Sequence, residues 1–243
     1  MSAIILPNSD KHFDKNSNRY QYRSYERALR LIPDNKRFIA LDIGAHVGYW
    51  TRAMLEDFKE VYSFEPSLEN YQYLLKNCKQ SNCYNIAIGE KSGFCDLADG
   101  GRGNENSGSY KTIDGKSIEV KSVDSFGIKN VSFIKVDVQG DEAKVIAGAS
   151  NTIMKYRPII SVECIYEGEL DLELIYSIVN LLDYKLLDIS SKDYIFIPSE
   201  YKFPKDFSYK LNDKEKKQFK KRYKLLSKFM FCKFDEKKSK LII

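Results

Sequence analysis

The stretch that decides the fold is Phe38-Ile39-Ala40-Leu41-Asp42-Ile43-Gly44-Ala45-His46-Val47-Gly48-Tyr49-Trp50. The apolar run at residues 38–41 predicts a β-strand that is covered on both faces. Gly44 and Gly48 carry no Cβ, so the backbone between strand and helix can pass close to a ligand. Asp42 lies at the carboxyl end of the strand, where open α/β sheets bind their ligands. The stretch therefore predicts a strand, a tight turn that faces a ligand, and a helix.

A second acidic residue ends the next predicted strand, Val61-Tyr62-Ser63-Phe64-Glu65-Pro66. Glu65 follows the first strand by about twenty residues, the spacing at which a carboxylate holds the hydroxyls of a ribose. A dinucleotide-binding turn needs glycine in the middle of G-x-G-x-x-G, and His46 stands at that position. A ligand with a ribose and an adenine but no pyrophosphate fits better, and S-adenosylmethionine (SAM) is the obvious one.

The composition is that of a globular protein with one sizeable domain. The chain has 243 residues, is 43% hydrophobic and 30% charged, and carries a formal net charge of +5. This mild charge is no argument for nucleic-acid binding by itself. The five cysteines show neither zinc spacing nor a disulfide framework, and we find no signal sequence or membrane-spanning stretch. We therefore expect a cytoplasmic protein.

Strands alternate with helices along the chain, which predicts a doubly wound α/β sheet. We expect an N-terminal arm and helix over residues 1–33, the main domain over 34–198 and a basic helical tail over 199–243. We also expect one strand at residues 83–88, one helix at 141–155 and a mobile glycine-rich loop at 99–109. The tail helix, 213–230, has an apolar stripe. We favour docking of that stripe on the core over binding of the helix to a membrane or an anionic polymer.

Taken in order, these segments resemble the FkbM-type SAM-dependent methyltransferases. The resemblance covers residues 38–198 and rests on residues 41–48, 64–66, 106–109, 133–142, 145–149 and 157–163. It implies a class I methyltransferase fold with a mostly parallel, seven-stranded Rossmann-like sheet and helical appendages at both termini. It also implies SAM as the methyl donor and a hydroxyl acceptor. The family usually has asparagine in place of His46 and often glutamate in place of Gln139.

The expected cofactor-binding residues lie in the glycine turn and at the strand ends: Asp42, Gly44, Ala45, His46, Gly48, Glu65, Pro66, Asn85, Ala87 and Asp137. Asp42 would accept hydrogen bonds from the ammonium group of SAM, and Glu65 from the ribose hydroxyls.

The expected catalytic residues are Asp137, Lys135 and Glu163. Lys135, Asp137 and Gln139 alternate along one strand and its exit, so they share a face. Asp137 would position SAM, bind a metal or act as a general base, and Lys135 would keep it ionised. Glu163 ends the next strand and is a second candidate base or an anchor for the acceptor. We predict no metal site, because no histidine-rich ligand set accompanies these carboxylates.

These observations predict an O-methyltransferase that acts on a hydroxyl of a sugar, a glycan or another small metabolite. One alternative is a ribose 2′-O-methyltransferase of RNA, which the basic tail would suit. However, we find no lysine placed to complete a Lys-Asp-Lys-Glu tetrad, and nucleic acid is the less favoured partner. The other alternative is a non-catalytic SAM-fold module that binds a partner through the tail.

Overall fold

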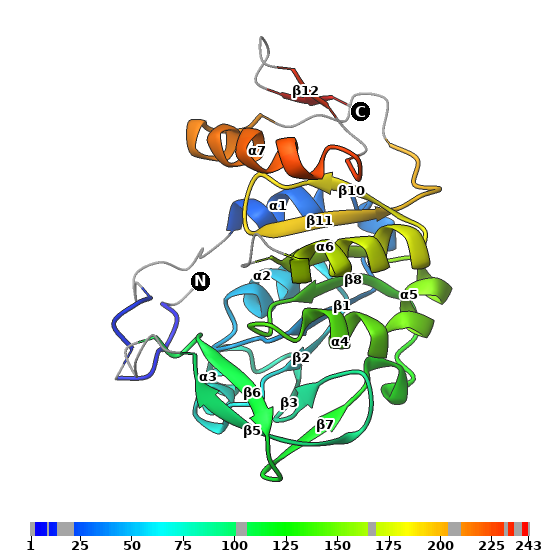
Figure 1. Ribbon diagram of the computed structural model, residues 1–243. Coiled ribbons are helices and arrows are strands. Elements are labelled where there is room, and N and C mark those ends of the chain that lie inside the picture. The colour runs from blue at the N-terminus through cyan, green and yellow to red at the C-terminus, as the bar shows by residue number, and fades with distance from the viewer. Residues whose placement is uncertain are drawn as a thin grey trace.

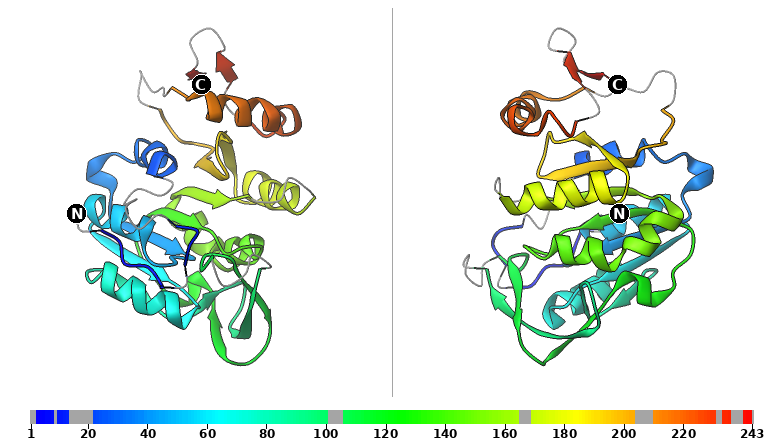
Figure 2. Two further views of the ribbon diagram at one scale, coloured as in Figure 1. Left: turned by 90° about the vertical axis from the view of Figure 1, so that its left-hand side faces the viewer. Right: turned by 45° about the vertical axis from the view of Figure 1, so that its right-hand side comes forward.

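The computed structural model describes residues 3–8, 10–13, 22–100, 106–164, 169–203, 210–230, 233–235 and 240–242. A seven-stranded sheet forms the centre, and helices cover both of its faces (Figure 1). The blue to cyan helices α1 (Tyr22–Leu29), α2 (Tyr49–Asp57) and α3 (Leu68–Asn77) lie on one face. The green to yellow helices α4 (Glu142–Gly148), α5 (Ser150–Tyr156) and α6 (Glu169–Tyr176) lie on the other (Figure 2).

The central sheet has the seven strands that the resemblance implies, and it is mixed. Its spatial order is β10 (Tyr184–Asp188), β11 (Asp193–Pro198), β9 (Ile159–Glu163), β8 (Val131–Val136), β1 (Ile39–Ile43), β2 (Glu60–Phe64) and β3 (Asn82–Tyr84). The strands from β9 to β3 pair in parallel, whereas β11 is antiparallel to both β9 and β10. A short turn joins β10 to β11, and such a turn can connect only antiparallel neighbours.

A second, four-stranded sheet contains β4 (Ala87–Ile88), β7 (Ile118–Lys121), β5 (Gly93–Asp99) and β6 (Tyr110–Asp114). The prediction of one strand over residues 83–88 is wrong, because β3 and β4 belong to different sheets. The extended segment is interrupted at Asn85. The side-chain amide of Asn85 donates to the carbonyls of Glu65 (2.9 Å) and Pro66 (3.0 Å). Strand β6, which the sequence did not predict, pairs antiparallel with β5. Of the loop predicted as mobile, residues 101–105 lie outside the described part of the chain.

The helix predicted over residues 141–155 is two helices, α4 and α5, which meet at Ala149. The break accompanies a close backbone contact, since a Cβ on Gly148 would lie 2.0 Å from the carbonyl oxygen of Gly89. Helix α6 continues into a π-helical turn, Ser177–Leu181. Short 3-10 helices lie at Asp34–Lys36 and Val123–Phe126, and β12 (Lys233–Asp235) pairs with β13 (Lys240–Ile242).

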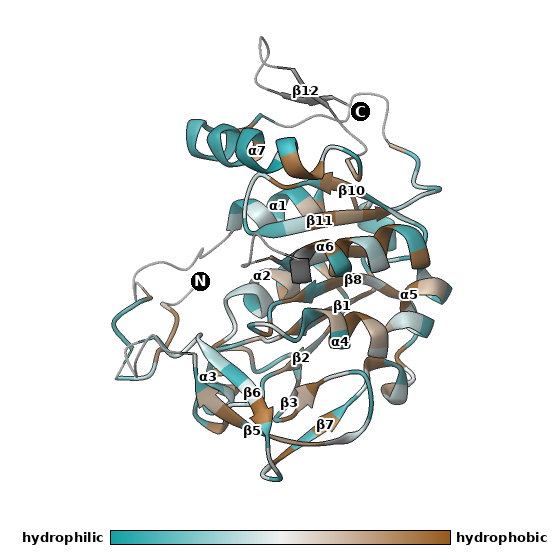
Figure 3. Cartoon of the chain, in the orientation of Figure 1, coloured by the Kyte–Doolittle hydropathy of each residue, from teal (hydrophilic) through white to brown (hydrophobic). Residues whose placement is uncertain are grey.

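The main hydrophobic core includes both helices that were expected as appendages. Tyr25 and Ala28 of α1 are buried in it, and so are Phe219 and Leu226 of α7 (Asp213–Leu226). Figure 3 shows the apolar strands at the centre and the largely hydrophilic surface of α7. The apolar stripe of the tail helix is therefore used to dock on the core. Within the described residues, no helix combines the length and the apolar character needed to span a bilayer.

Candidate functional site

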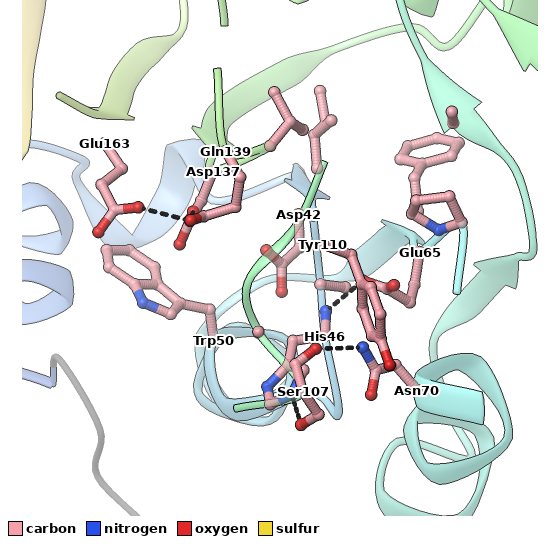
Figure 4. A pocket seen from close by; sticks show the side chains of 18 of the residues that line it. Asp42, His46, Trp50, Glu65, Asn70, Ser107, Tyr110, Asp137, Gln139 and Glu163 are labelled. Carbon is pink, nitrogen blue, oxygen red and sulfur yellow. Dashed lines mark hydrogen bonds between the residues drawn. The ribbon is translucent and has the colours of Figure 1, made fainter. Parts of the chain in front are cut away.

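A pocket opens where β1, β2, β8 and β9 end. Its walls include Asp42 from β1, Glu65 directly after β2, Asp137 directly after β8 and Glu163 at the end of β9. The carboxyl ends of parallel strands meet at one edge of a sheet, so residues far apart in the chain gather there. Figure 4 shows these carboxylates around the cavity, with Trp50 and Tyr110 beside them.

Most of the predicted site residues line this pocket. They are Asp42, Gly44, Ala45, His46, Glu65, Pro66, Ala87, Lys135, Asp137 and Glu163. Gly48 and Asn85 are not part of the lining. A Cβ on Gly48 would lie 2.4 Å from the Sγ atom of Cys78, so this glycine allows α2 to pack against α3. Asn85 supports the exit of β2 through its bonds to two carbonyls.

The glycine turn is held in place by the neighbouring strand. The N–H groups of Gly44 and Ala45 both donate to the carbonyl of Phe64, at 3.0 Å each. His46 then adopts a left-handed backbone with φ of 52°, and its N–H donates to Oε2 of Glu65 at 2.8 Å. These hydrogen bonds thus fix the position of the glycine turn relative to the Glu65 carboxylate.

Asp42 is fully buried, and its two carboxyl oxygens differ in their hydrogen bonding. Its Oδ2 atom accepts a hydrogen bond from Thr51 Oγ1 at 2.6 Å. Its Oδ1 atom has no hydrogen-bond partner among the described residues. Burial raises the pKa of the Asp42 carboxyl, against the charge of Lys135 and the bond from Thr51. A buried acceptor without a partner is costly, so this atom is suited to a ligand with a hydrogen-bond donor.

Glu65 is buried beside the same turn. Its carboxylate accepts from the N–H groups of Ser67 (2.9 Å) and His46 (2.8 Å). Burial outweighs these bonds and raises the pKa of Glu65 to about 7. Each oxygen keeps a second lone pair, which could accept from a ligand hydroxyl.

Asp137 and Glu163 are joined through one amide. Gln139 Nε2 donates to Asp137 Oδ1 at 2.8 Å and to Glu163 Oε2 at 2.9 Å (Figure 4). Lys135 Nζ donates to the other oxygen of Asp137 at 3.0 Å. Gln139 reaches both acids from a left-handed backbone with φ of 60°. Glu142 stabilises this turn by accepting from the N–H groups of Val138 and Gly140.

This cluster shifts the pKa values of the two acids in opposite directions. Although burial opposes it, the Lys135 charge and the hydrogen bonds lower the pKa of Asp137. Burial and the negative charge of Asp137 raise the pKa of Glu163. Burial lowers the pKa of Lys135, but Asp137, Asp42 and Asp193 outweigh it and raise that pKa. At neutral pH, Lys135 and Asp137 are therefore charged and Glu163 holds a proton.

Several lining residues were not predicted. The N-terminal arm contributes His12 and Phe13, helix α3 contributes Asn70, and the turn before β11 contributes Lys192. The end of the predicted glycine-rich loop contributes Asn106, Ser107 and Gly108. Of these lining residues, only those at 106–108 could have been found from the sequence, because they belong to a segment that carries the family resemblance. The arm and Lys192 carried no such signal, because their place at the pocket depends on contacts between distant parts of the chain.

Among the described residues, no group of three His, Cys, Asp or Glu side chains has an arrangement that could hold a metal ion. The chemistry of the pocket is that of carboxylates, two lysines, two histidines and hydrogen-bonding amides.

Comparison with known proteins gives one family match. The family model of the methyltransferase FkbM domain matches residues 42–189. Among solved structures, the chain is similar to a methyltransferase FkbM from Methylobacillus flagellatus KT, at 17% identity and a TM-score of 0.49, over 67% of this chain and 44% of that chain. It is also similar to a precorrin-6y C5,15-methyltransferase from Geobacter metallireducens GS-15, at 11% identity and a TM-score of 0.39, over 70% and 84% of the two chains. The chain thus spans less than half the length of the first of these structures. No curated protein matches it.

Proposed function

Because the chain belongs to the FkbM methyltransferase family, we propose that it transfers a methyl group from SAM to a hydroxyl of a sugar, a glycan or another small metabolite. The observation that carries the proposal is the pair of carboxylates at the ends of β1 and β2. Asp42 has a buried oxygen without a partner, and Glu65 has spare acceptor capacity on the same wall. They match a ligand with an ammonium group at one end and a ribose diol farther along.

The rest of the pocket suits the same ligand. Ile86, Ala87 and Ile88 are buried and line the wall beyond Glu65, where an adenine would find apolar contact. The opposite end carries the ionised Asp137, paired with Lys135, and the Asp42 carboxyl, whose pKa burial raises. A cationic ligand beside Asp42 would favour the ionised form of this carboxyl, and SAM carries both an ammonium and a sulfonium.

The acceptor would bind on the side of Asp137 and Glu163. Bound SAM supplies an electrophilic methyl group, and the products are S-adenosylhomocysteine, the methyl ether and the proton of the hydroxyl. A carboxylate with a lowered pKa is a weak base, and Lys135 lowers the pKa of Asp137. Asp137 therefore acts first by orienting the reactants through its oxygens, and it takes a proton only once the hydroxyl oxygen has become strongly acidic. Lys135 and Gln139 hold the carboxylate for this role.

Water must also be kept from the reacting groups. Asn106, Ser107 and Gly108 line the pocket, and Ser107 is held there by Asp10, Asn70 and His46, so these residues would exclude water from that side of the site.

The test is calorimetric titration with S-adenosylhomocysteine. We expect micromolar binding, about −8 kcal/mol. The variant Asp42→Asn keeps an oxygen for Thr51 but loses the charge, and it should bind at least about tenfold more weakly. Asp34→Ala, an exposed acid outside the pocket, is the matched control and should bind as the unaltered protein does. An unaltered protein that binds no S-adenosylhomocysteine would contradict the proposal and favour a non-catalytic binding module.

A further inference from the structure

Three walls of the pocket meet at Ser107. Its N–H donates to Asp10 Oδ2 at 3.0 Å, and its hydroxyl donates to the same oxygen. Its carbonyl accepts from Asn70 Nδ2 of α3 at 2.8 Å. Its Oγ atom also contacts His46 Nε2 at 2.6 Å (Figure 4). Every polar group of this buried serine is thus used, and the four bonds reach three different parts of the chain.

Asp10 is the acceptor that organises this junction. It is only 4% exposed. While Oδ2 accepts both bonds from Ser107, Oδ1 accepts from the N–H groups of His12 (2.9 Å) and Phe13 (3.0 Å). The bonds from Ser107 and from the arm outweigh burial and lower the pKa of Asp10, so its carboxyl is ionised at neutral pH. One carboxylate therefore shapes the turn of the arm and ties it to the pocket wall.

The hydrogen-bond directions also determine the tautomer of His46. A serine hydroxyl has one proton, and Ser107 gives it to Asp10. The contact with His46 must then use a proton on Nε2, which leaves Nδ1 as an unprotonated acceptor. Burial lowers the pKa of His46 to about 4, so the ring is neutral. The His46 ring is thereby given one donor and one acceptor.

Apolar contacts also pack the arm against the glycine turn that carries His46. The Phe13 and His46 rings lie 4.7 Å apart between centroids, and a Cβ on Gly108 would come within 3.1 Å of the Phe13 ring. Earlier in the arm, Ile4 and Leu6 are buried against Val47 and Tyr49. Asn77 of α3 also bonds both the N–H and the carbonyl of Ile5. The described parts of the arm, residues 3–8 and 10–13, thus pack on the glycine turn and end at the pocket.

We propose that Asp10 is a positioning residue of the cofactor site, which clamps the arm to Ser107 and, through the Ser107 hydroxyl, sets His46 as the Nε2–H tautomer. This inference rests on the proposed function, because it assigns the clamp to the binding of SAM. Asp10 itself does not line the pocket, whereas His12, Phe13, His46 and Ser107 all do. The carboxylate thus acts through the residues that it holds.

The first test separates binding from chemistry. In Asp10→Asn the side chain keeps only one oxygen, so it cannot accept from both Ser107 and the N–H groups of the arm, and the wall loosens. The KM for SAM and the dissociation constant of S-adenosylhomocysteine should each rise by roughly tenfold, while kcat changes little. Asp96→Asn is the matched control. Asp96 also accepts two backbone N–H groups, those of Lys116 and Ser117, but it lies outside the pocket, so binding should be unchanged. A fall in kcat with no change in KM would overturn the assignment.

The second test needs neither cofactor nor activity. The chain has only two histidines, so ¹⁵N-histidine NMR of the ligand-free protein resolves the ring nitrogens, and His46→Asn assigns them. We expect His46 as the neutral Nε2–H form. In Asp10→Ala the Ser107 hydroxyl loses its acceptor and is free to donate to Nε2, so the Nδ1–H form should appear, and in Ser107→Ala the preference should be lost. An unchanged tautomer in both variants would overturn the link between Asp10 and His46. If the tautomer shifts but the unaltered protein binds no S-adenosylhomocysteine, the proposed function fails and the hydrogen-bond link remains.

Discussion

Gly44 lies so close to Asp137 that a Cβ built on the glycine would be 1.8 Å from the carbonyl oxygen of the aspartate. The N–H of Asp137 also donates to the carbonyl of Ile43 at 2.9 Å. The glycine turn after β1 and the exit of β8 are therefore packed backbone against backbone. Glycine is needed at position 44 because of the neighbouring strand, whatever the ligand requires of the turn. This contact fixes the cofactor turn relative to the Asp137 carboxylate.

Gly44→Ala should consequently destabilise the fold. Position 44 has a left-handed φ of 81°, and a backbone oxygen cannot move away as a flexible side chain could. We expect a loss of at least about 2 kcal/mol in the free energy of unfolding, measured by urea denaturation. Two controls separate the causes. Gly127→Ala has positive φ but an open surrounding and should cost less, and Gly93→Ala has neither feature and should be neutral. Equal losses at positions 44 and 127 would rule out the steric contact.

Glu65 should make cofactor binding depend on pH. Its pKa is about 7 in the folded protein, and an ionised carboxylate is the better acceptor for ribose hydroxyls. S-adenosylhomocysteine should therefore bind more weakly as the pH falls below about 7, with release of a proton on binding. Calorimetry in buffers of different ionisation enthalpy would measure that proton. Glu65→Gln should bind weakly at every pH, and a persistent pH dependence in this variant would assign the effect to another group.

The same residue affects stability in a defined pH window. Between the ordinary pKa of 4.5 and the folded value of about 7, the folded protein holds a proton that the unfolded chain has lost. The contribution of Glu65 to stability must therefore decrease as the pH rises through this window, by about 3 kcal/mol. The stability of Glu65→Gln relative to the unaltered protein should rise over the same range in urea denaturation. A constant difference between the two proteins would show that Glu65 does not titrate there.

The sequence patterns predicted the elements that local chemistry determines. Apolar runs marked the strands of the central sheet, and Asp42 and Glu65 were recognised because a strand ends at each. Strand β6 was missed because its pairing with β5 spans a segment rich in glycine and asparagine that has no periodic signal. The break at Asn85 depends on its bonds to two carbonyls some twenty residues earlier in the chain.

The arm shows most clearly what local patterns cannot reveal. Asp10 and Ser107 are separated by 97 positions, and nothing in either segment alone indicates the contact. Likewise, the proton on Glu163 follows from the negative charge of Asp137 on the adjacent strand and from burial. The candidate acids could be named from the sequence, but their protonation states depend on the assembled site.

The ion cluster beneath α7 should stabilise the tail helix. Glu215 accepts from Arg23 (2.8 Å) and from the buried Arg27 (2.7 Å), and Arg27 also donates to Asp188 at 2.7 Å. Glu215→Gln leaves Arg27 with half of its negative partners, and we expect a loss of about 2–4 kcal/mol in the free energy of unfolding. Asp213→Asn in the same helix removes only an exposed pair with Lys216 and should leave stability unchanged. If both variants lose stability equally, the buried cluster is not what anchors the helix.

The pair of Asp137 and Glu163 gives opposite expectations for two isosteric changes. Since Glu163 holds a proton at neutral pH, Glu163→Gln resembles the native state, and kcat should stay within about threefold. Asp137→Asn removes the ionised partner of Lys135 and the charge at the reacting edge, so kcat should fall at least about tenfold while the dissociation constant of S-adenosylhomocysteine changes less. Because the pKa of Asp137 is lowered and that of Glu163 is raised, the pair should add no inflection to kcat near neutral pH. Thermal unfolding of each variant controls for misfolding. A fall in kcat that is as large for Glu163→Gln as for Asp137→Asn would mean that Glu163 acts as an ionised carboxylate. The assignment of the proton to Glu163 would then be wrong.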